Sequence, residues 1–395
     1  MINDPINNPS FVTEPLVVTV ERILPGGVGL AHLEGKTVFV SLAAPGDRVR
    51  IRVDREKGNL LYASIVEVVE PSSERIEPPC PYFGRCGGCD FQQLNYSAQL
   101  HAKADIVRDC LYRIAGLDIP DIRIIPSPSE WQYRARATWQ LDSFEHTIGY
   151  YERSSRRVCD VAQCAVLVSP LQSTLEQVRN TGAEVVPNGL KHLDAVIGDN
   201  GVSLAPSFDS FHTRELTLRV KDETYTYNAE AFFQVNQQLL DQIVDFALLD
   251  VEGDTALDLY CGVGLFTLPL ARKFKNVIGV EANPIATRFA RRNLQQAQLS
   301  NARIVTATVT DWIRSSKNTV DFVLLDPPRA GAESAVIKGI LDARPSGISY
   351  VSCDPATLAR DLKKLVAGGF RVESLRGFDM FPQTHHVETI VHLRL

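Results

Sequence analysis

Residues 255–274, TALDLYCGVGLFTLPLARKF, combine a short apolar strand, a glycine turn and an amphipathic helix. Strand-like and helix-like segments then alternate to the last residues, from NVIGVEANP through VDFVLLDPPRAG and GISYVSCDP to VETIVHLRL. Regular alternation of this kind is typical of a doubly wound α/β sheet. We therefore predict a Rossmann-like α/β domain over residues 229–395, entered through the segment AFFQVNQQLLDQIVDFALL.

The composition indicates a globular protein. A chain of 395 residues with 45% hydrophobic and 22% charged side chains can form two or three domains with sizeable cores. Apolar runs such as Phe322–Leu325 are too short to span a bilayer, and the start MINDPINNPSFVTEP lacks the features of a signal peptide. We expect a cytoplasmic protein with no membrane association. The net charge of -6 leaves room for a local basic face that binds nucleic acid.

Residues 12–70 contain a run of short β segments. VVTVERI, TVFVSL, DRVRIRV and LYASIVEVV are separated by Pro-Gly and Gly turns, which predicts a small β-barrel similar to oligonucleotide-binding folds. Residues 1–14 are polar and we expect them to be loose. In DRVRIRV, Arg48, Arg50 and Arg52 alternate with apolar residues and therefore share one strand face. This face is either solvated or binds the RNA backbone, and the sequence does not separate the two.

A cysteine cluster follows the linker EPSSERIEPP, at the start of a central region that we place at residues 71–228. Cys80, Cys86 and Cys89 have the spacing C-x5-C-x2-C, and the intervening glycines allow a tight fold. Cys110 falls on a helix expected over about residues 95–118, where it serves packing. Cys159 and Cys164 are then the remaining candidates for a fourth ligand. The spacing leaves zinc and an iron–sulfur cluster open.

The central region also contains arginines next to aromatic residues. WQYRARATWQL places Arg134 and Arg136 beside Trp131, Tyr133 and Trp139, and a similar segment, IGYYERSSRRV, follows. Such interleaving suits phosphate contact and base stacking. It also suits a half-buried sheet with a charged outer face, which the segment alone slightly favours.

The turn after the first strand of the α/β domain indicates which cofactor binds. Asp258-Leu-Tyr-Cys-Gly262-Val-Gly264 lacks the third glycine of a dinucleotide fingerprint, so no pyrophosphate is expected to approach it. Glu281 ends the next strand, where a carboxylate can accept both ribose hydroxyls. Together with Asp326 these acids suit S-adenosylmethionine, which has a ribose and a sulfonium but no phosphate. Asp326-Pro-Pro-Arg329 has an arginine where amino-group methyltransferases carry an aromatic residue, which favours a carbon target.

The segment Ser352-Cys353-Asp354-Pro355 places a cysteine at the carboxyl end of a strand, on the edge where open α/β sheets bind ligands. Carbon 5 of uracil is a poor nucleophile, but a thiolate added at carbon 6 makes it reactive. A base must afterwards remove the proton from carbon 5. Glu388, which opens the last strand, can reach the same edge. We therefore predict Cys353 as the nucleophile and Glu388 as the base.

Taken together, these motifs closely resemble the RNA uracil-5-methyltransferase family over nearly the whole chain. The resemblance rests on a TRAM-like start, the cysteine cluster, FFQVN, DLYCGVGLFTLPLA, DPPRAG, SCDPATLARDL and HHVET. It implies a class I methyltransferase domain, an N-terminal TRAM/OB-like β-barrel and a central α+β iron–sulfur domain. It also implies that the helix at residues 95–118 can pack on the catalytic domain.

The resemblance assigns roles residue by residue. It implies S-adenosylmethionine contacts at Gln234, Tyr260, Glu281 and Asp326. It implies a [4Fe–4S] cluster on Cys80, Cys86, Cys89 and Cys164, because DVAQC matches the context of the family's distal cysteine. The chain departs from some members at Leu265 and at Thr308, so these two cofactor contacts are in doubt.

The cluster and the TRAM-like segment also bear on the target. Members that act on large-subunit ribosomal RNA look like this chain, whereas the bacterial transfer-RNA enzymes generally lack both features, although cluster-bearing relatives that act on transfer RNA exist. The resemblance therefore favours 23S ribosomal RNA over transfer RNA as the substrate. We also expect the chain to be a monomer. Two other classes stay open at this stage. They are an iron–sulfur oxidoreductase that uses a dinucleotide, and a non-catalytic RNA-binding protein.

Overall fold

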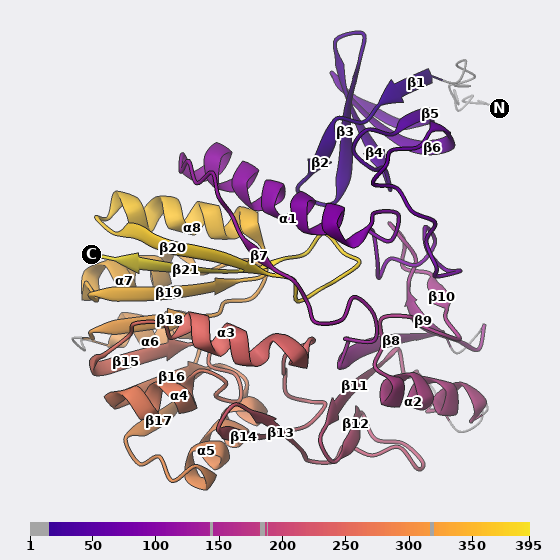
Figure 1. The fold of residues 1–395 in the computed structure, drawn as a ribbon. Helices are drawn as coiled ribbons and strands as arrows, with labels where there is room; N and C mark the ends of the chain where they lie inside the picture. Colours follow the sequence, from indigo (N-terminus) through magenta and orange to yellow (C-terminus); the bar gives the residue numbers. More distant parts are fainter. Residues whose placement is uncertain (1–15, 143–144, 182–185, 188, 317–319) are drawn as a thin grey trace, which may run out of the picture.

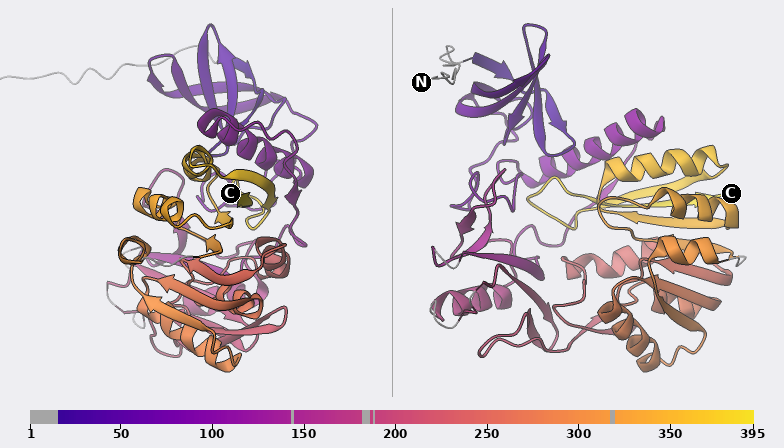
Figure 2. Two further views of the ribbon diagram at one scale, coloured as in Figure 1. Left: turned by 90° about the vertical axis from the view of Figure 1, so that its left-hand side faces the viewer. Right: turned by 180° about the vertical axis from the view of Figure 1, so that it is seen from behind.

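The computed structural model describes residues 16–142, 145–181, 186–187, 189–316 and 320–395. Three β-sheet regions follow one another along the chain: a small N-terminal sheet, a central sheet and a large C-terminal sheet (Figure 1). The expectation for residues 1–14 lies outside the described residues. Viewed from behind, the N-terminal sheet stands apart at the top of the molecule, and a helix lies between it and the large sheet (Figure 2).

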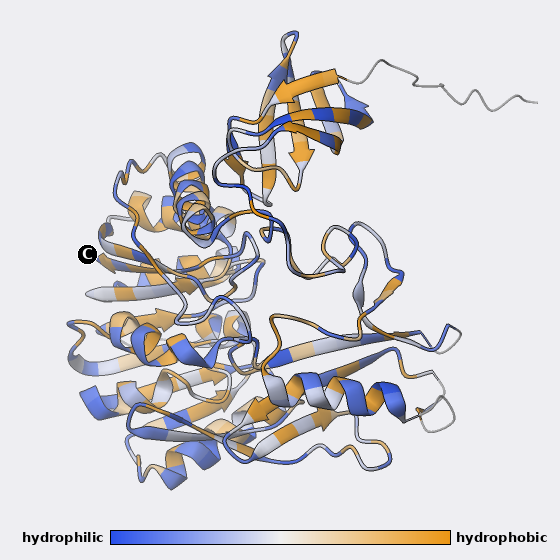
Figure 3. Cartoon of the chain, turned by 45° about the vertical axis from the view of Figure 1, so that its right-hand side comes forward, coloured by the Kyte–Doolittle hydropathy of each residue, from blue (hydrophilic) through white to orange (hydrophobic). Residues whose placement is uncertain are grey.

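The N-terminal sheet has six strands in the order β1-β5-β6-β4-β3-β2. They are β1 (Leu16–Thr19), β2 (Arg22–Leu24), β3 (Val28–Leu33), β4 (Lys36–Ser41), β5 (Arg48–Lys57) and β6 (Leu60–Glu70). Hydrophobic and polar residues alternate along these strands (Figure 3). One face therefore forms a core, in which Val38, Val40 and Val49 are fully buried.

The arginine face of β5 is paired with acids in this fold. Arg48 contacts Glu70, Arg50 contacts Glu67, and the Arg52 Nε donates to Asp54 at 3.1 Å. Both members of each pair are partly exposed. The pairing neutralises the arginines locally and favours a solvated outer face over a phosphate-binding face.

The central sheet has five strands in the order β10-β9-β8-β11-β12, and helix α2 packs on it. The elements are β8 (Arg136–Asp142), β9 (Thr147–Tyr151), β10 (Val158–Asp160), α2 (Ser169–Asn180), β11 (His192–Gly198) and β12 (Gly201–Ala205). Trp139 and Tyr133 are buried in this region and unavailable for base stacking. Arg136 donates to the carbonyl oxygens of Ala229 and Ala231, at 3.0 and 2.9 Å. These contacts give it an internal structural role.

The C-terminal sheet is doubly wound, as predicted. Its eight strands lie in the order β17-β16-β15-β18-β19-β21-β20-β7. The C-terminal strands are β15 (Gly253–Leu259), β16 (Phe274–Glu281), β17 (Ala302–Thr306), β18 (Phe322–Leu325), β19 (Gly347–Ser352), β20 (Arg371–Phe378) and β21 (Glu388–Arg394). Strand β21 runs antiparallel to both β19 and β20. Strand order reverses between β15 and β18, and such a reversal leaves a crevice at the carboxyl ends of the strands where ligands bind.

Helices cover both faces of this sheet and bury its apolar side chains in two cores (Figure 1). One core includes α3 (Leu240–Ala247), α4 (Thr267–Lys273) and α5 (Pro284–Gln296). The other includes residues of α6 (Val309–Ser315), α7 (Ser334–Ala343) and α8 (Pro355–Ala367). Strands such as β18, in which all four residues are buried, are covered on both faces, which explains their continuous apolar sequence.

Segments from before residue 229 complete this C-terminal unit. Helix α1 (Tyr96–Cys110) continues into a π-helical turn (Leu111–Ala115), and both pack on α8. Strand β7 (Ile124–Ile125) then joins the edge of the large sheet beside β20. The hairpin of β13 (Leu216–Val220) and β14 (Glu223–Tyr227) contributes to the core under α5. Parts of the central region, residues 71–228, therefore pack with the C-terminal unit and not with the central sheet. The domain limits stay a prediction.

Within the described residues, no helix is both long and apolar enough to cross a membrane.

Candidate functional site

Cys353 and Glu388 lie opposite one another on two neighbouring antiparallel strands. Ser352 at the end of β19 pairs with Thr389 of β21. Continuing that register by one residue places Cys353 beside Glu388. Cys353 is half-buried, while Glu388 is only 6% exposed. The topology thus brings together two side chains that are 35 positions apart, at the sheet edge where the sequence predicted them.

Burial, assisted by neighbouring negative charges, disfavours the ionised forms of both groups. Burial, followed by the negative charges of Glu388 and Asp326, raises the pKa of Cys353 to about 12, and Arg329 partly opposes this. Burial and the neighbouring Asp326 raise the pKa of Glu388 well above its usual range, again against Arg329. These four side chains form one electrostatic unit. A cation bound beside the acids would favour the ionised carboxylates and lower the pKa of the thiol.

The glycine turn after β15 lies beside this unit. Glu281 accepts hydrogen bonds from the backbone N–H of Gly262 at 3.1 Å and of Asn283 at 2.7 Å. Tyr260 has a φ of 66°, a left-handed conformation rarely adopted by a residue with a bulky side chain. Its hydroxyl donates to Glu333 at 2.5 Å. The turn and the end of β16 are therefore linked directly through the carboxylate of Glu281.

Two acids, the buried Asp258 and the half-buried Asp326, lie at the point where strand order reverses. Burial raises the pKa of Asp258 and of Asp326 to about 7 each. Thr267 donates to Oδ2 of Asp258 at 2.5 Å, while Oδ1 has no hydrogen-bond partner among the described residues. An unsatisfied buried carboxylate oxygen is costly unless a ligand contacts it. The arrangement suits a ligand with hydroxyl donors and a positive charge.

The remaining expected cofactor positions differ in their surroundings. Gln234 is half-buried between the exposed Phe232 and the buried Asn236. Leu265 is 6% exposed and belongs to the hydrophobic core, so its side chain makes no polar cofactor contact. Thr308 caps helix α6 by accepting from the Asp311 N–H at 3.1 Å. Leu265 and Thr308 therefore both have structural roles here.

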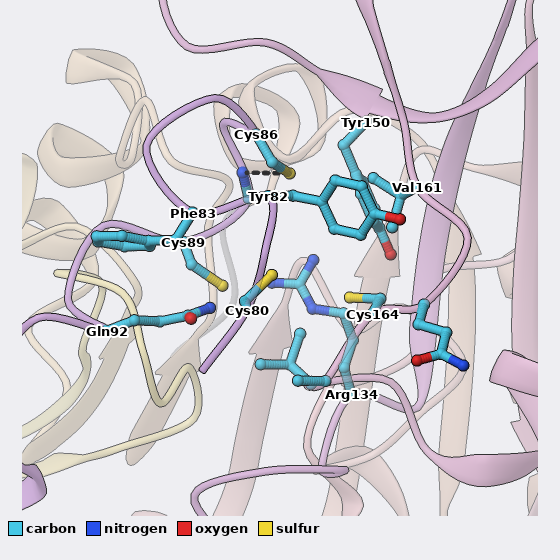
Figure 4. Close-up of a pocket in the computed structure, with 14 residues that line it drawn as sticks. Cys80, Tyr82, Phe83, Cys86, Cys89, Gln92, Arg134, Tyr150, Val161 and Cys164 are labelled. Atoms are coloured by element: carbon cyan, nitrogen blue, oxygen red, sulfur yellow. Dashed lines mark hydrogen bonds between the residues drawn. The ribbon is translucent and has the colours of Figure 1, made fainter. Parts of the chain in front are cut away.

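Four cysteines line one pocket that lies between the linker after β6 and the central sheet (Figure 4). They are Cys80, Cys86, Cys89 and Cys164. Cys159 is fully buried in β10 and lies outside the pocket lining. Cys164 thus lies where a fourth ligand would be needed.

Zinc and an iron–sulfur cluster require different arrangements of four cysteines. Within the described residues, no three cysteine, histidine or acidic side chains converge as ligands of one metal ion. A tetrahedral zinc site requires all four sulfurs about 2.3 Å from one point. In a [4Fe–4S] cluster each cysteine binds a different iron, so the sulfurs stay farther apart. The four cysteines therefore share one pocket, and which metal group they hold stays a prediction.

Arg134 also lines the cysteine pocket. The sequence alone predicts it either in contact with RNA phosphate or on a charged outer face of a sheet. Figure 4 shows its guanidinium among the sulfurs of Cys80, Cys89 and Cys164. Burial raises the pKa of Cys89 to about 12, and the charge of Arg134 partly opposes this rise. The Arg134 Nε has no hydrogen-bond partner within the described part of the chain. A positive charge with a free donor suits a negatively charged group bound by thiolates. The strand pairing that directs it inward is a tertiary property, so no sequence signal was available.

Comparison with known proteins adds independent observations. Residues 208–395 match the family model described as tRNA (Uracil-5-)-methyltransferase, and residues 9–66 match the TRAM domain. The chain is 33% identical to an RNA methyltransferase of Aquifex aeolicus, over 97% of this chain and 99% of that relative. It is 33% identical to the 23S rRNA (uracil(1939)-C(5))-methyltransferase RlmD of Pectobacterium atrosepticum, over 95% of this chain and 92% of the relative.

A solved structure resembles the whole fold. The tRNA (uracil-54, C5)-methyltransferase of Pyrococcus abyssi, in complex with S-adenosyl-L-homocysteine, superposes with a TM-score of 0.74 at 26% sequence identity. The match covers 95% of this chain and 100% of that protein. The N-terminal sheet, the central sheet and the doubly wound sheet therefore recur together in a protein that binds the demethylated form of the methyl donor.

Proposed function

Since the chain belongs to the S-adenosylmethionine-dependent RNA uracil-5-methyltransferases, we propose that it methylates carbon 5 of a uridine in 23S ribosomal RNA through a covalent adduct with Cys353. The observation that carries this proposal is the placement of Cys353 opposite Glu388 at the cofactor edge of the sheet. The relative that acts on 23S ribosomal RNA is more similar to this chain than the structural neighbour that acts on transfer RNA, at 33% against 26% identity. A cytoplasmic location and a monomeric state stay predictions.

The protein's side chains account for each bond change in the reaction. The thiolate of Cys353 adds to carbon 6 of uracil, and the displaced electron pair moves to the carbonyl oxygen as an enolate. When bound, S-adenosylmethionine supplies an electrophilic methyl group on its sulfonium. Carbon 5 would take this methyl group as the bond between the methyl and the sulfonium breaks, which leaves S-adenosylhomocysteine and returns the enolate to a carbonyl. Glu388 then removes the proton from carbon 5, the bond between Sγ and carbon 6 breaks, and the ring double bond re-forms.

The acids of the crevice prepare the groups for these steps. Gln234, Tyr260, Glu281 and Asp326 would hold the cofactor. Its sulfonium charge beside Asp326 would oppose the negative charges that raise the pKa of Cys353. Arg329 acts in the same direction and stabilises both the thiolate and the carboxylate of Glu388. The thiol thus becomes reactive only once the donor is in place.

The cysteine pocket would hold a [4Fe–4S] cluster through Cys80, Cys86, Cys89 and Cys164. The support is that the four cysteines line one pocket and that the Arg134 guanidinium lies among them. Because the pocket lies in the central region and not at the edge of the large sheet, we propose a structural role. Arg134 offsets the negative charge that four thiolates bring to a buried site.

Trapping of the adduct tests the proposed function. Fluorine at carbon 5 cannot leave as a proton does, so RNA containing 5-fluorouridine should form a stable complex with the protein when S-adenosylmethionine is present. We expect a band that resists denaturation in wild type and none in Cys353→Ala. Glu388→Gln should still form the complex, because the base acts after adduct formation. A complex that forms equally well with Cys353→Ala would overturn the proposed nucleophile.

The RNA target needs a separate measurement. We expect cells that lack the protein to lose one 5-methyluridine from 23S ribosomal RNA and to keep 5-methyluridine in transfer RNA. Mass spectrometry of both RNA pools tests this. Loss of 5-methyluridine from transfer RNA alone would show that the substrate is transfer RNA, as it is for the structural neighbour.

A further inference from the structure

The segment that leads to Glu388 is held by the cysteine-bearing region rather than by its own sheet. This segment, residues 379–387, connects β20 to β21 and crosses over toward the linker that carries Cys80 to Cys89 (Figure 1). We name it the catalytic loop. Its hydrogen-bond partners come mainly from residues 90–103 and from Tyr133. The position of the base therefore depends on a distant part of the chain.

Asp90, which directly follows Cys89, makes the densest set of these contacts. Its Oδ1 accepts from the backbone N–H of His385 at 2.8 Å, and its Oδ2 lies 2.5 Å from Nδ1 of the same residue. The backbone N–H groups of Asp90 and Phe91 both donate to the carbonyl oxygen of Gln383, each at 3.0 Å. His385 precedes Glu388 by three residues. Four interactions thus join the cysteine segment to the entrance of β21.

Gln383 shows why these contacts are needed. It is 1% exposed and has a φ of 69°, a left-handed conformation that costs about 1–3 kcal/mol for a residue other than glycine. Such a conformation persists only where surrounding contacts hold it. Gln99 exchanges two hydrogen bonds with the Gln383 backbone and side chain, at 2.9 and 3.0 Å, and Tyr133 donates to the Pro382 carbonyl at 2.8 Å.

The far end of the loop reaches the reaction centre. His386 stacks at an angle on His385, with ring centroids 4.1 Å apart, and its Nε2 lies 3.4 Å from the Arg329 guanidinium. Burial together with the charges of His385 and Arg329 lowers the pKa of His386 to about 3, so its ring is neutral and can accept from Arg329. Arg329 in turn stabilises the ionised forms of Cys353 and Glu388. A series of contacts therefore joins Asp90 to Arg329, whose charge acts on the catalytic pair.

We infer that Asp90 is a positioning residue that couples the cysteine site to the proton-removal step, by holding the catalytic loop in the conformation that presents Glu388 to carbon 5. This inference rests on the proposed function and adds to it. Asp90 touches neither substrate nor donor. Its loss should therefore leave attack by Cys353 and methyl transfer largely intact, and should slow the later removal of the proton.

Proton removal follows adduct formation, so a defect in proton removal alone has an effect that general destabilisation of the protein does not have. If proton removal becomes slow, methylated adduct should accumulate on ordinary uridine RNA, where wild type releases it. In Asp90→Ala we expect adduct breakdown to slow by about 10-fold to 100-fold, the effect of a small displacement of a catalytic group. Asp90→Asn keeps an acceptor for the His385 N–H and should slow breakdown less. Single-turnover reactions, quenched and resolved on denaturing gels, measure the adduct directly.

Asp160→Ala is the matched control. Asp160 also lies close to the cysteines in sequence, accepts from the Ile148 N–H at 3.2 Å and pairs with Arg179, but it contacts no residue of the catalytic loop. It should show no accumulated adduct. Iron content and thermal unfolding of each variant separate the loop effect from misfolding. Loss of activity in Asp90→Ala without accumulated adduct, or equal accumulation in Asp160→Ala, would overturn the inference.

Amide hydrogen exchange tests the coupling without reference to activity. In Asp90→Ala and in Cys89→Ser, the backbone N–H of His385 should exchange faster than in wild type, while helix α7 should be unchanged. Unaltered exchange over residues 379–388 in both variants would contradict the coupling. These results also distinguish failure of this inference from failure of the proposed function. If the proposed function were wrong, wild type would form no adduct with 5-fluorouridine RNA.

Discussion

Cys353 lies among charges of both signs, and their balance determines how much thiolate the free protein contains. Burial, Glu388 and Asp326 disfavour the thiolate, and Arg329 favours it. A pKa of about 12 means that the thiolate fraction falls about tenfold for each unit by which the pH lies below that value. The free protein therefore keeps Cys353 protonated at neutral pH.

Alkylation of Cys353 in the free protein tests this balance. We expect its rate with iodoacetamide to rise steadily from pH 7 to pH 10 without a plateau. Arg329→Met removes a stabilising charge and should slow the reaction about threefold to tenfold at a given pH, whereas Asp326→Asn should accelerate it by a similar factor. Peptide mass spectrometry isolates Cys353 from the other seven cysteines.

Arg314→Met serves as the control for the alkylation series, since Arg314 lies on α6 and away from the cysteine. It should alkylate at the wild-type rate. A plateau below pH 9 in wild type, or the same direction of change in Arg329→Met and Asp326→Asn, would refute the assignment of the charges.

At the scale of single elements, strand β5 shows how pairing can cancel an apparent signal. Its three arginines share one face as the alternation predicted, but the neighbouring β6 and Asp54 supply an acid to each. The sequence shows the alternation, whereas strand pairing determines which acids lie opposite. Paired surface charges contribute little to the potential that attracts a polyanion.

A triple substitution of these arginines tests the interpretation. We expect Arg48→Ser, Arg50→Ser and Arg52→Ser combined to change RNA affinity by less than about threefold, with an unchanged slope of binding against salt concentration. Filter binding at several salt concentrations measures both. If the slope of binding against salt concentration becomes less steep, by the equivalent of two or three released ions, the arginines contact phosphates despite their acidic neighbours.

At the scale of the whole molecule, α1 joins parts of the chain that are far apart in sequence. It lies between the N-terminal sheet and the large sheet (Figure 2). Lys103 on α1 forms an ion pair with Asp379, 276 positions away, and both side chains are fully buried. The Lys103 Nζ also donates to the Phe381 carbonyl at 3.0 Å. Burial disfavours the charged lysine and lowers its pKa, which Asp379 opposes.

Removing one partner of this pair should be more harmful than removing both. Lys103→Met leaves an unpaired buried carboxylate and should lower the free energy of unfolding by about 3–5 kcal/mol. The double variant Lys103→Met with Asp379→Leu should recover part of that loss. Urea unfolding of the two single variants and the double variant measures the coupling. Equal destabilisation by the single and double variants would show that the pair is not energetically coupled.

The sequence by itself determined the class of fold, the small β-barrel at the start and the helix that becomes α1, because hydrophobic periodicity and glycine turns are local properties. It also indicated three groups of candidate functional residues. They are Cys353 and Glu388 at one sheet edge, the acids around a cofactor turn that binds no phosphate, and three clustered cysteines. Their roles stay predictions until the adduct and the metal are measured.

Only the tertiary structure decided which distant residues meet. The antiparallel register of β19 and β21 places Cys353 opposite Glu388, the central sheet directs Arg134 and Cys164 into the cysteine pocket, and Asp90 and Lys103 hold the loop before the base. These contacts join residues tens to hundreds of positions apart. A local pattern carries no information about such neighbours, because strand order and packing are set by the burial of the whole chain.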